Sequence, residues 1–287
     1  MEIEKAVSKI LGSNEHVYAV YHIGGGYINH TYKVVTDKTS YFLKSNNAKL
    51  FPKMFELEMK GLETLAAYSS FKIPKPIGST EINNNSCLLM EYIDSSIKKP
   101  EFYELLGRKL AQMHMQHANK FGMEYNNYIG SLKQINIQES NWADFYIYKR
   151  LEPMMALCVK EGLLKSDIFD KLSGLENFAK NEMPTENPCL LHGDLWSGNI
   201  IADDKGEPVL VDPSIYYGHR EMDIAMTLFI GSFDEAFYSE YHNIYPLEPN
   251  WKKRIGFCLI YYYLVHLNLF GRPYLTKTLE LINEYAR

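Results

Sequence analysis

The sequence predicts an α+β fold, in which a small strand-rich N-terminal lobe with one helix precedes a larger helical C-terminal lobe. Its 287 residues are enough for two modest lobes with a sizeable core. Strand patterns dominate residues 17–93, and helical patterns dominate from residue 102 onwards. We therefore expect the lobes to span residues 1–92 and 93–287.

The N-terminal lobe is expected to hold one sheet and one helix packed on it. A short amphipathic helix over residues 1–12 precedes this sheet. Residues 51–68 carry apolar side chains at helical spacing, whereas the Ile-Pro-Lys-Pro run at residues 73–76 predicts an extended segment because proline disfavours helix. Apolar, β-branched and aromatic residues predict strands over residues 17–23, 31–35, 41–44 and 87–92.

The C-terminal lobe is predicted to be mainly helical. A short buried strand over residues 188–191 should be followed by a hairpin of residues 199–202 and 208–212, with a glycine-containing turn. The predicted helices cover residues 102–119, 142–160, 167–181, 223–239 and 251–270.

Composition excludes several classes of protein. The net charge of −5 argues against a nucleic-acid partner, which would favour a basic surface. The sequence contains no run of eighteen apolar residues, so it predicts no membrane span. The N-terminus lacks the apolar core of a signal peptide. Four scattered cysteines without a C-x-x-C pair suit reduced, buried thiols. We therefore expect a cytoplasmic protein with no membrane partner.

The most informative motif begins at His192-Gly193-Asp194. Asp194 is followed after four residues by Asn199, and Asp212 ends the apolar strand of the predicted hairpin. Protein kinases space a catalytic aspartate, a metal-binding asparagine and a metal-binding aspartate in this way. The pattern predicts that Asp194 accepts the proton of an attacking hydroxyl, and that Asn199 and Asp212 hold Mg²⁺ on the phosphates of ATP. An ordinary turn is the alternative, but the flanking strand and hairpin favour the catalytic loop.

A nucleotide site is predicted in the N-terminal lobe. Gly24, Gly25 and Gly26 separate two strands, where backbone N–H groups can approach phosphates closely. A plain hairpin turn is the alternative, since Asn29 stands where a third glycine would complete the kinase pattern. The main-chain groups of Met90, Glu91 and Tyr92 are expected to bind adenine, unless this segment is simply an edge strand.

Lys44 lies at the end of a predicted strand, where kinases place the lysine that contacts the α- and β-phosphates. A lysine there can also be merely solvated, so its partner matters. Glu58 lies on the predicted helix and is the preferred ion-pair partner, with Glu56 as the alternative.

The sequence of the loop at residues 192–199 and of the segment after Asp212 differs from that of protein kinases, and the differences indicate another class of kinase. Gly193 replaces the arginine of H-R-D, Pro213 follows Asp212, and little room is left for an activation segment. The H-G-D form resembles the superfamily of aminoglycoside phosphotransferases and choline kinases.

Within that superfamily, the runs 192–199 and 212–223 resemble the fructosamine kinase (ketosamine-3-kinase) family. Further similarity lies in residues 24–29, 54–58 and 128–132, so the resemblance covers about residues 15–270. It implies ATP-dependent phosphorylation of the 3-hydroxyl of a ketosamine, which in many members frees a glycated amine or protein. Bacterial-type members are expected to prefer ribulosamines or erythrulosamines over fructosamines. Tyr27 replaces the loop cysteine of many eukaryotic members, so no regulatory disulfide is expected there.

A sugar could stack on Trp196, and four residues of the second run could shape the rest of the substrate pocket: Tyr216, Tyr217, His219 and Arg220. Arg220 could instead pair with a carboxylate, and Tyr217 could be core. Asp223 is expected to cap its helix and brace the loop, His114 to be a hydrogen-bonded structural residue, and residues 261–264 to pack in the core.

Two other functions stay open at this point. The chain could phosphorylate a different amine-bearing small molecule, such as an aminoglycoside or an amino alcohol. It could also be a catalytically silent nucleotide-binding protein. The sequence argues against a catalytically silent protein, because such a relative could lose one of the four residues of the kinase pattern, and all four are present: Lys44, Asp194, Asn199 and Asp212.

Overall fold

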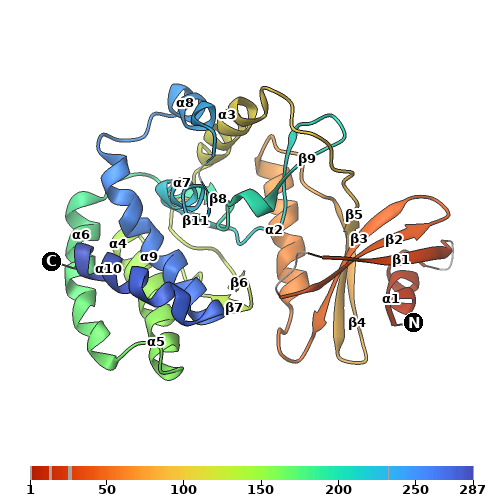
Figure 1. The fold of residues 1–287 in the computed structure, drawn as a ribbon, viewed down its shortest axis with the longest axis horizontal. Coiled ribbons are helices and arrows are strands. Elements are labelled where there is room, and N and C mark those ends of the chain that lie inside the picture. Colours follow the sequence, from red (N-terminus) through yellow and green to blue (C-terminus); the bar gives the residue numbers. More distant parts are fainter. Residues whose placement is uncertain (1, 13–14, 25–27, 232, 287) are drawn as a thin grey trace. The chain divides into compact units, whose positions relative to one another are not determined.

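The computed structural model describes residues 2–12, 15–24, 28–231 and 233–286. The chain forms two compact units (Figure 1). Unit 1 comprises residues 1–102 and 200–213, and unit 2 comprises residues 103–199 and 214–287. The predicted α+β class is confirmed, since the N-terminal part is an antiparallel sheet with helices and the later part is mainly helical. The expected functional division between residues 92 and 93 stays a prediction.

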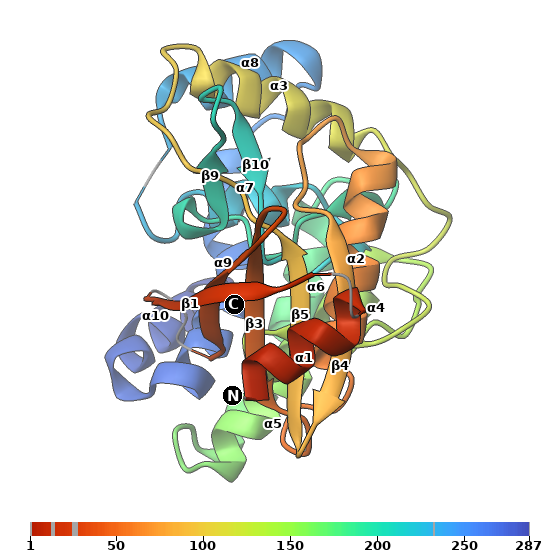
Figure 2. The same cartoon turned by 90° about the vertical axis from the view of Figure 1, so that its right-hand side faces the viewer.

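Unit 1 is built on a five-stranded antiparallel sheet with the strand order β1-β2-β3-β5-β4 (Figure 2). In the register of the sheet, Lys44 of β3 is paired with Thr31 on one side and Leu88 on the other. The strands are β1 (Val17–Ile23), β2 (His30–Thr36), β3 (Ser40–Asn47), β4 (Pro76–Ile82) and β5 (Asn85–Glu91).

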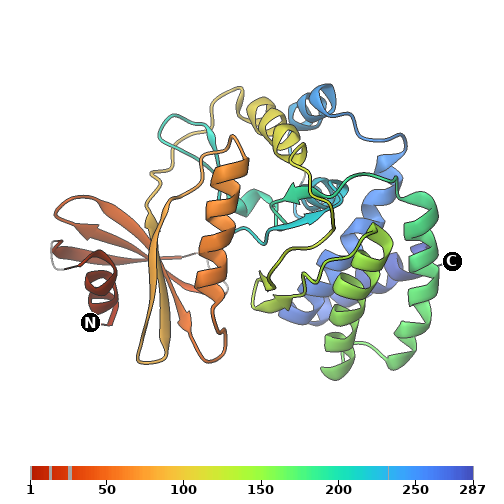
Figure 3. The same cartoon turned by 180° about the vertical axis from the view of Figure 1, so that it is seen from behind.

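Two helices cover opposite faces of this sheet, α1 (Glu2–Leu11) and α2 (Met54–Tyr68), as Figures 1 and 3 show. Ala6 and Val7 of α1 pack with Leu43 in a buried apolar cluster. Because successive side chains of a strand point to opposite faces, Lys44 faces α2 instead. The side chain of Lys44 therefore lies under α2, and its neighbour Leu43 packs in the apolar cluster on the other face.

The predicted hairpin of the later sequence is confirmed and belongs to unit 1. Strands β9 (Ile200–Ala202) and β10 (Pro208–Leu210) pair in antiparallel fashion, with Ile200 opposite Leu210. The N–H of Leu210 donates to the carbonyl of Lys72 at 3.3 Å, which attaches the hairpin to the segment before β4. Residue 199 precedes and residue 212 follows the same end of the hairpin, as the sequence predicts.

Unit 2 is organised around the long helix α9 (Trp251–Phe270), against which α5, α7 and α10 pack. Short two-stranded pairings join β8 to β11 and β6 to β7. Its other helices are α3 (Phe102–His114), α4 (Trp142–Tyr146), α5 (Glu152–Lys160), α6 (Leu172–Glu182), α7 (Glu221–Met226), α8 (Glu235–Ile244) and α10 (Leu275–Tyr285). Its strands are β6 (Asn127–Ile129), β7 (Leu132–Gln134), β8 (Cys189–Leu191) and β11 (Tyr216–Gly218).

The helices predicted over residues 223–239 and 102–119 are wrong in extent. The helix expected over residues 223–239 is divided into α7 and α8, and Gly231 adopts a left-handed φ of 72° in the interval. Asp234 then caps α8 by accepting from the N–H of Ala236 at 2.9 Å. The helix expected over residues 102–119 ends at His114, because residues 116–118 form backbone hydrogen bonds with the segment 188–190 instead.

Several elements were not predicted at all. Strands β4, β6, β7 and β11 are short or half-exposed, so they carry little apolar alternation, and α10 follows the last predicted helix. Helix α2 begins at Met54 rather than at residue 51. Strands of this kind form because a partner strand offers hydrogen bonds, which a local pattern does not reveal.

The cysteine prediction is confirmed, since Cys87, Cys158, Cys189 and Cys258 are all free and buried. Within the described ranges, none of the helices combines the length and the apolar character that crossing a bilayer requires.

Candidate active site

In unit 1, a buried lysine is held between two carboxylates. The Nζ of Lys44, on β3, lies 2.6 Å from Oε1 of Glu58 on α2 and 2.5 Å from Oδ1 of Asp212, which follows β10. The Lys44 side chain is only 3% exposed. The predicted ion pair with Glu58 is confirmed, whereas Glu56 lies exposed on the same helix.

The two carboxylates keep this lysine charged. Burial alone would lower the pKa of Lys44, but the charges of Asp212 and Glu58 outweigh it and raise the pKa above its ordinary value. Burial also raises the pKa of the Glu58 carboxyl, against the opposing effect of Lys44. The result is a fixed cation with a defined position, which is what an anionic phosphate chain requires.

Asp212 has an unusual backbone conformation for a residue with a side chain. Its φ of 54° lies in the left-handed region, and residues held there are found often at functional sites. Its side chain is 49% exposed, so the carboxylate is accessible while one oxygen contacts Lys44. A half-exposed carboxylate of this kind can serve as a ligand for a hard cation.

The predicted phosphate loop is described only in part. Gly24 is exposed beyond the end of β1, and an added Cβ would meet no atom within 4 Å. Gly25 and Gly26 lie outside the described residues, as does Tyr27. Asn29, which replaces the third glycine, accepts a hydrogen bond from Nδ2 of Asn46 at 3.0 Å. The role of this loop in phosphate binding stays a prediction.

The predicted adenine segment lies at the end of β5. Met90 is buried and pairs with Phe42 in the sheet, and the N–H of Glu91 donates to the carbonyl of Lys75 at 2.8 Å. The ring of Tyr92 lies under the ammonium of Lys33, 4.1 Å from the ring centroid. Because the Glu91 N–H is already used, an adenine contact would depend on the neighbouring main-chain groups.

In unit 2, Asp194 and Asn199 are joined directly. The Nδ2 of Asn199 donates to both the carbonyl and Oδ2 of Asp194, each at 2.9 Å. The N–H of Asn199 donates to the carbonyl of Trp196 at 3.0 Å, which closes the 3₁₀ turn of residues 197–199. The amide nitrogen of Asn199 therefore orients the Asp194 carboxylate, and its amide oxygen is the atom suited to a metal.

The backbone before Asp194 is fixed by Asp223 of α7. The N–H groups of His192 and Gly193 donate to its two carboxylate oxygens at 2.7 and 2.9 Å. Gly193 has a left-handed φ of 82°, and a Cβ there would lie 2.2 Å from the carbonyl oxygen of Ser214. Glycine is therefore required at this position. The expected bracing of the loop by Asp223 is confirmed, but the expected helix cap is wrong, because Asp223 lies within α7 and the N-cap position is Arg220.

Two further residues support the loop from the core of unit 2. His114 is bonded to Oδ2 of Asp223 at 3.3 Å and to the hydroxyl of Tyr241 at 2.8 Å, which confirms its structural role. Burial lowers the pKa of His114. Tyr262 donates to the carbonyl of Gly193 at 3.2 Å, although the sequence suggested only core packing. No local signal distinguishes such a tyrosine from an ordinary core residue.

The predicted substrate residues lie in different environments. Trp196 is half-buried, and its ring covers Gly198 so closely that a Cβ there would lie 2.3 Å from the indole. Tyr217 is also half-buried and pairs through its backbone with Gly122. Tyr216 and His219 are buried, at 0% and 1% exposure.

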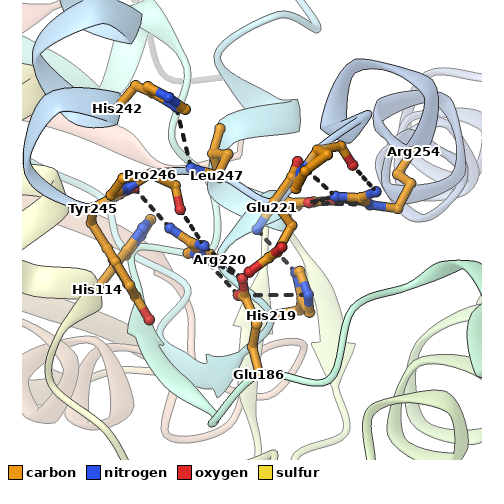
Figure 4. Close-up of polar contacts among 12 residues, drawn as sticks. His114, Glu186, His219, Arg220, Glu221, His242, Tyr245, Pro246, Leu247 and Arg254 are labelled. Atoms are coloured by element: carbon orange, nitrogen blue, oxygen red, sulfur yellow. Dashed lines mark hydrogen bonds and ion pairs between the residues drawn. The ribbon is translucent and has the colours of Figure 1, made fainter.

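Arg220 points into a polar cluster rather than towards solvent (Figure 4). Its guanidinium contacts Glu186 at 2.6–3.0 Å and donates to the carbonyls of Tyr245 and Pro246, each at 2.8 Å. It is 3% exposed. These contacts favour the alternative that Arg220 is structural, and burial weighs in the same way against Tyr216 and His219 as substrate contacts.

Comparisons with known sequences agree along the whole chain. The fructosamine kinase family model matches residues 1–287. A chloroplastic protein-ribulosamine 3-kinase of Arabidopsis thaliana is 40% identical over 270 residues, covering 92% of this chain and 82% of the relative. A ketosamine-3-kinase of Mus musculus is 30% identical, covering 99% of this chain and 100% of the relative.

Comparisons with solved structures agree with the sequence comparisons. The crystal structure of a candidate fructosamine-3-kinase from Haemophilus somnus superposes with a TM-score of 0.90 at 26% identity, covering 99% of this chain and 97% of the other. An aminoglycoside phosphotransferase, APH(4)-Ia, superposes with a TM-score of 0.64 at 15% identity over 99% of this chain and 98% of its own, which indicates a shared fold alone. The chain belongs to the fructosamine kinase family.

Proposed function

We propose that this protein transfers the γ-phosphoryl group of ATP to the 3-hydroxyl of a ketosamine. Two relatives that cover most of its length are named for ribulosamine and ketosamine 3-kinase activity. The observation that carries the proposal is that this family member keeps all four polar residues of the kinase pattern: Lys44, Asp194, Asn199 and Asp212. An aminoglycoside kinase is not favoured, because the likeness to those enzymes extends to the fold alone.

The chemistry follows from the charges described above. The acceptor oxygen forms a bond to the γ-phosphorus while the bond from that phosphorus to the β-phosphate oxygen breaks, and ADP leaves. Asp194 would accept the proton of the acceptor hydroxyl, in the orientation that Asn199 gives it. Lys44 would contact the α- and β-phosphates and offset their negative charge, with Glu58 holding it in place.

Asp212 and Asn199 would hold Mg²⁺ in this proposal. The donor set fits, because one accessible carboxylate and one amide oxygen are hard ligands, and Mg²⁺ in kinases takes its remaining ligands from water and phosphates. When bound, the metal would neutralise charge on the transferring phosphate.

The acceptor is proposed to be a ribulosamine, an erythrulosamine or a fructosamine, carried by a free amine or by a glycated protein. The half-buried indole of Trp196 offers an apolar face on which a sugar ring can stack. Phosphorylation would destabilise the adduct and free the amine, so the biological role would be deglycation. The four free buried cysteines suit a reducing compartment, for which we propose the cytoplasm.

The test is an ATP-consumption assay on the purified protein. Lysine-bound ribulosamine and fructosamine are compared with an aminoglycoside and with choline, and Asp194→Asn serves as the inactive control. We expect ADP release with the ketosamines, and phosphorus NMR should place the new ester on the 3-oxygen. Turnover of the aminoglycoside alone would support the alternative function, phosphorylation of a different amine-bearing small molecule. Tight ATP binding without any turnover would support a catalytically silent nucleotide-binding protein.

A further inference from the structure

Two peptide groups lead into Asp194, and they are held in different ways. The His192–Gly193 peptide has two partners outside the loop. Its oxygen accepts from the N–H of Ser214 at 2.9 Å, and its N–H donates to Oδ1 of Asp223 at 2.9 Å. This peptide is therefore anchored at both ends by the core of unit 2.

The next peptide, Gly193–Asp194, immediately precedes the proposed base. Its N–H donates to Nδ1 of His192 at 3.3 Å, a contact within the loop itself. Its oxygen accepts from the hydroxyl of Tyr262, on α9, at 3.2 Å. Tyr262 is fully buried and lies 69 residues away in the sequence. Its hydroxyl thus ties this peptide to α9, a helix far away in the sequence.

The orientation of this peptide matters for the carboxylate that follows it. The direction of the Asp194 side chain depends on the plane of the Gly193–Asp194 peptide, because that plane fixes the position of the Asp194 backbone. Gly193 has no Cβ and can occupy a wide range of backbone angles, so it resists rotation of the peptide weakly. A catalytic group that is misplaced by about 1 Å can lose about 100-fold in rate.

We propose that Tyr262 is a positioning residue for phosphoryl transfer, whose hydroxyl sets the direction of the Asp194 carboxylate through the carbonyl of Gly193. The inference rests on the function proposed above. Burial raises the pKa of the Tyr262 phenol well above its ordinary value, so the hydroxyl remains a donor throughout the working pH range.

The test is Tyr262→Phe, which removes one oxygen and keeps the ring. We expect kcat to fall at least about fivefold, while KM for ATP and for the ketosamine each stay within about twofold. A purely structural role would instead lower the melting temperature and leave kcat of the folded enzyme unchanged.

A matched control is Tyr146→Phe in the same unit. Tyr146 is equally buried, and its hydroxyl donates to the carbonyls of Phe257 and Cys258, which lie on α9 and not in the catalytic loop. This variant should lose stability to a similar degree without the fall in kcat. The inference is overturned if Tyr262→Phe keeps kcat within about twofold of the wild type, or if both variants lower kcat equally.

Two readouts separate this inference from the proposed function. Ketosamine phosphorylation is measured beside the slow hydrolysis of ATP by water, with Asp194→Asn as the background for both. If the wild type phosphorylates no ketosamine, the proposed function fails, and the loss of Asp194-dependent hydrolysis in Tyr262→Phe still decides the role of Tyr262. If no Asp194-dependent hydrolysis exists either, both ideas are rejected.

Discussion

In unit 1 the Lys44 ammonium is fixed by direct contact with two carboxylates, whereas in unit 2 the Asp194 loop is fixed through its backbone. Glu58 and Asp212 contact the lysine at 2.6 and 2.5 Å, and both are polar residues of the proposed nucleotide site. The loop instead donates two backbone N–H groups to the carboxylate of Asp223, on α7, and accepts a hydrogen bond from the hydroxyl of Tyr262, on α9.

This difference indicates how each unit should respond to change. In unit 1 the supporting groups, Glu58 and Asp212, belong to the proposed nucleotide site, so their removal should alter ligand binding before it alters the fold. In unit 2 the supporting groups are part of the core, so their removal should lower stability. The side chain of Asp194 does not hold the loop backbone and can be exchanged without that cost. Substitutions in each unit, ordered by the size of the expected change, can test that contrast.

The largest effect is expected for Asp194→Asn, at the tip of the loop. Losing the base should lower kcat on the order of 1000-fold, about 4 kcal/mol, because proton transfer is impaired. ATP affinity and melting temperature should change little, since Asp223 and not Asp194 holds the loop backbone. Steady-state kinetics and calorimetry check both parts. A variant that keeps more than about a tenth of the wild-type kcat would rule out Asp194 as the base.

Asp212→Ala should abolish Mg²⁺-dependent ATP binding, with a loss of at least about 100-fold, roughly 2.7 kcal/mol. The substitution removes the proposed charged ligand and also one partner of Lys44. Asn199→Ala should weaken the metal requirement less, because it removes a neutral ligand. Titration calorimetry with and without Mg²⁺ measures both. Wild-type affinity of Asp212→Ala for Mg·ATP would show that the metal assignment is wrong.

Trp196→Ala tests the substrate side of unit 2. We expect KM for a ribulosamine to rise at least about tenfold, roughly 1.4 kcal/mol, while KM for ATP stays near the wild-type value. The ring is half-buried and lies against Gly198, so the melting temperature should change little. If the protein instead loses its stability and the folded fraction keeps its KM, Trp196 is a core residue.

Glu58→Gln should have a smaller effect on the nucleotide side. Lys44 keeps Asp212 as a partner, so we expect KM for ATP to rise about fivefold, roughly 1 kcal/mol, without a change in KM for the ketosamine. Glu56→Gln, on the exposed face of the same helix, is the matched control and should behave as the wild type. Equal effects of the two substitutions would contradict the functional role of the ion pair.

The smallest effect is a loss of folding stability at low pH, which should appear in unit 2 alone. Burial lowers the pKa of His114, His219 and His266, whereas the three histidines of unit 1 are exposed. The unfolded chain therefore binds more protons than the folded one as the pH falls through about 6.5, so stability is lost below that value and retained above it. Hydrogen exchange at pH 7 and 5.5 should show unit 2 losing protection first. Equal loss in both units would contradict the prediction.

Much of the proposed chemistry could be predicted because its signals are local. The spacing of Asp194 and Asn199 and the β9–β10 hairpin are short-range patterns, and the structure contains both. The predicted strand that carries Lys44 also forms, but it continues to Asn47, so the lysine lies within the strand rather than at its end. Helical periodicity likewise located α2, α5, α6 and α9.

The fold class, the resemblance to the family and the charged residues of the proposed site followed from the sequence alone, because they depend on residue types at fixed spacing. Which side chains turn inwards depends instead on the packing of segments that are far apart in the sequence. Arg220 lies in a run that suggested a substrate pocket, yet it pairs with Glu186, 34 residues away. Tyr262 supports Gly193 from 69 residues away. A buried guanidinium or hydroxyl must find a partner, and which partner is near depends on how distant helices pack rather than on neighbouring residues.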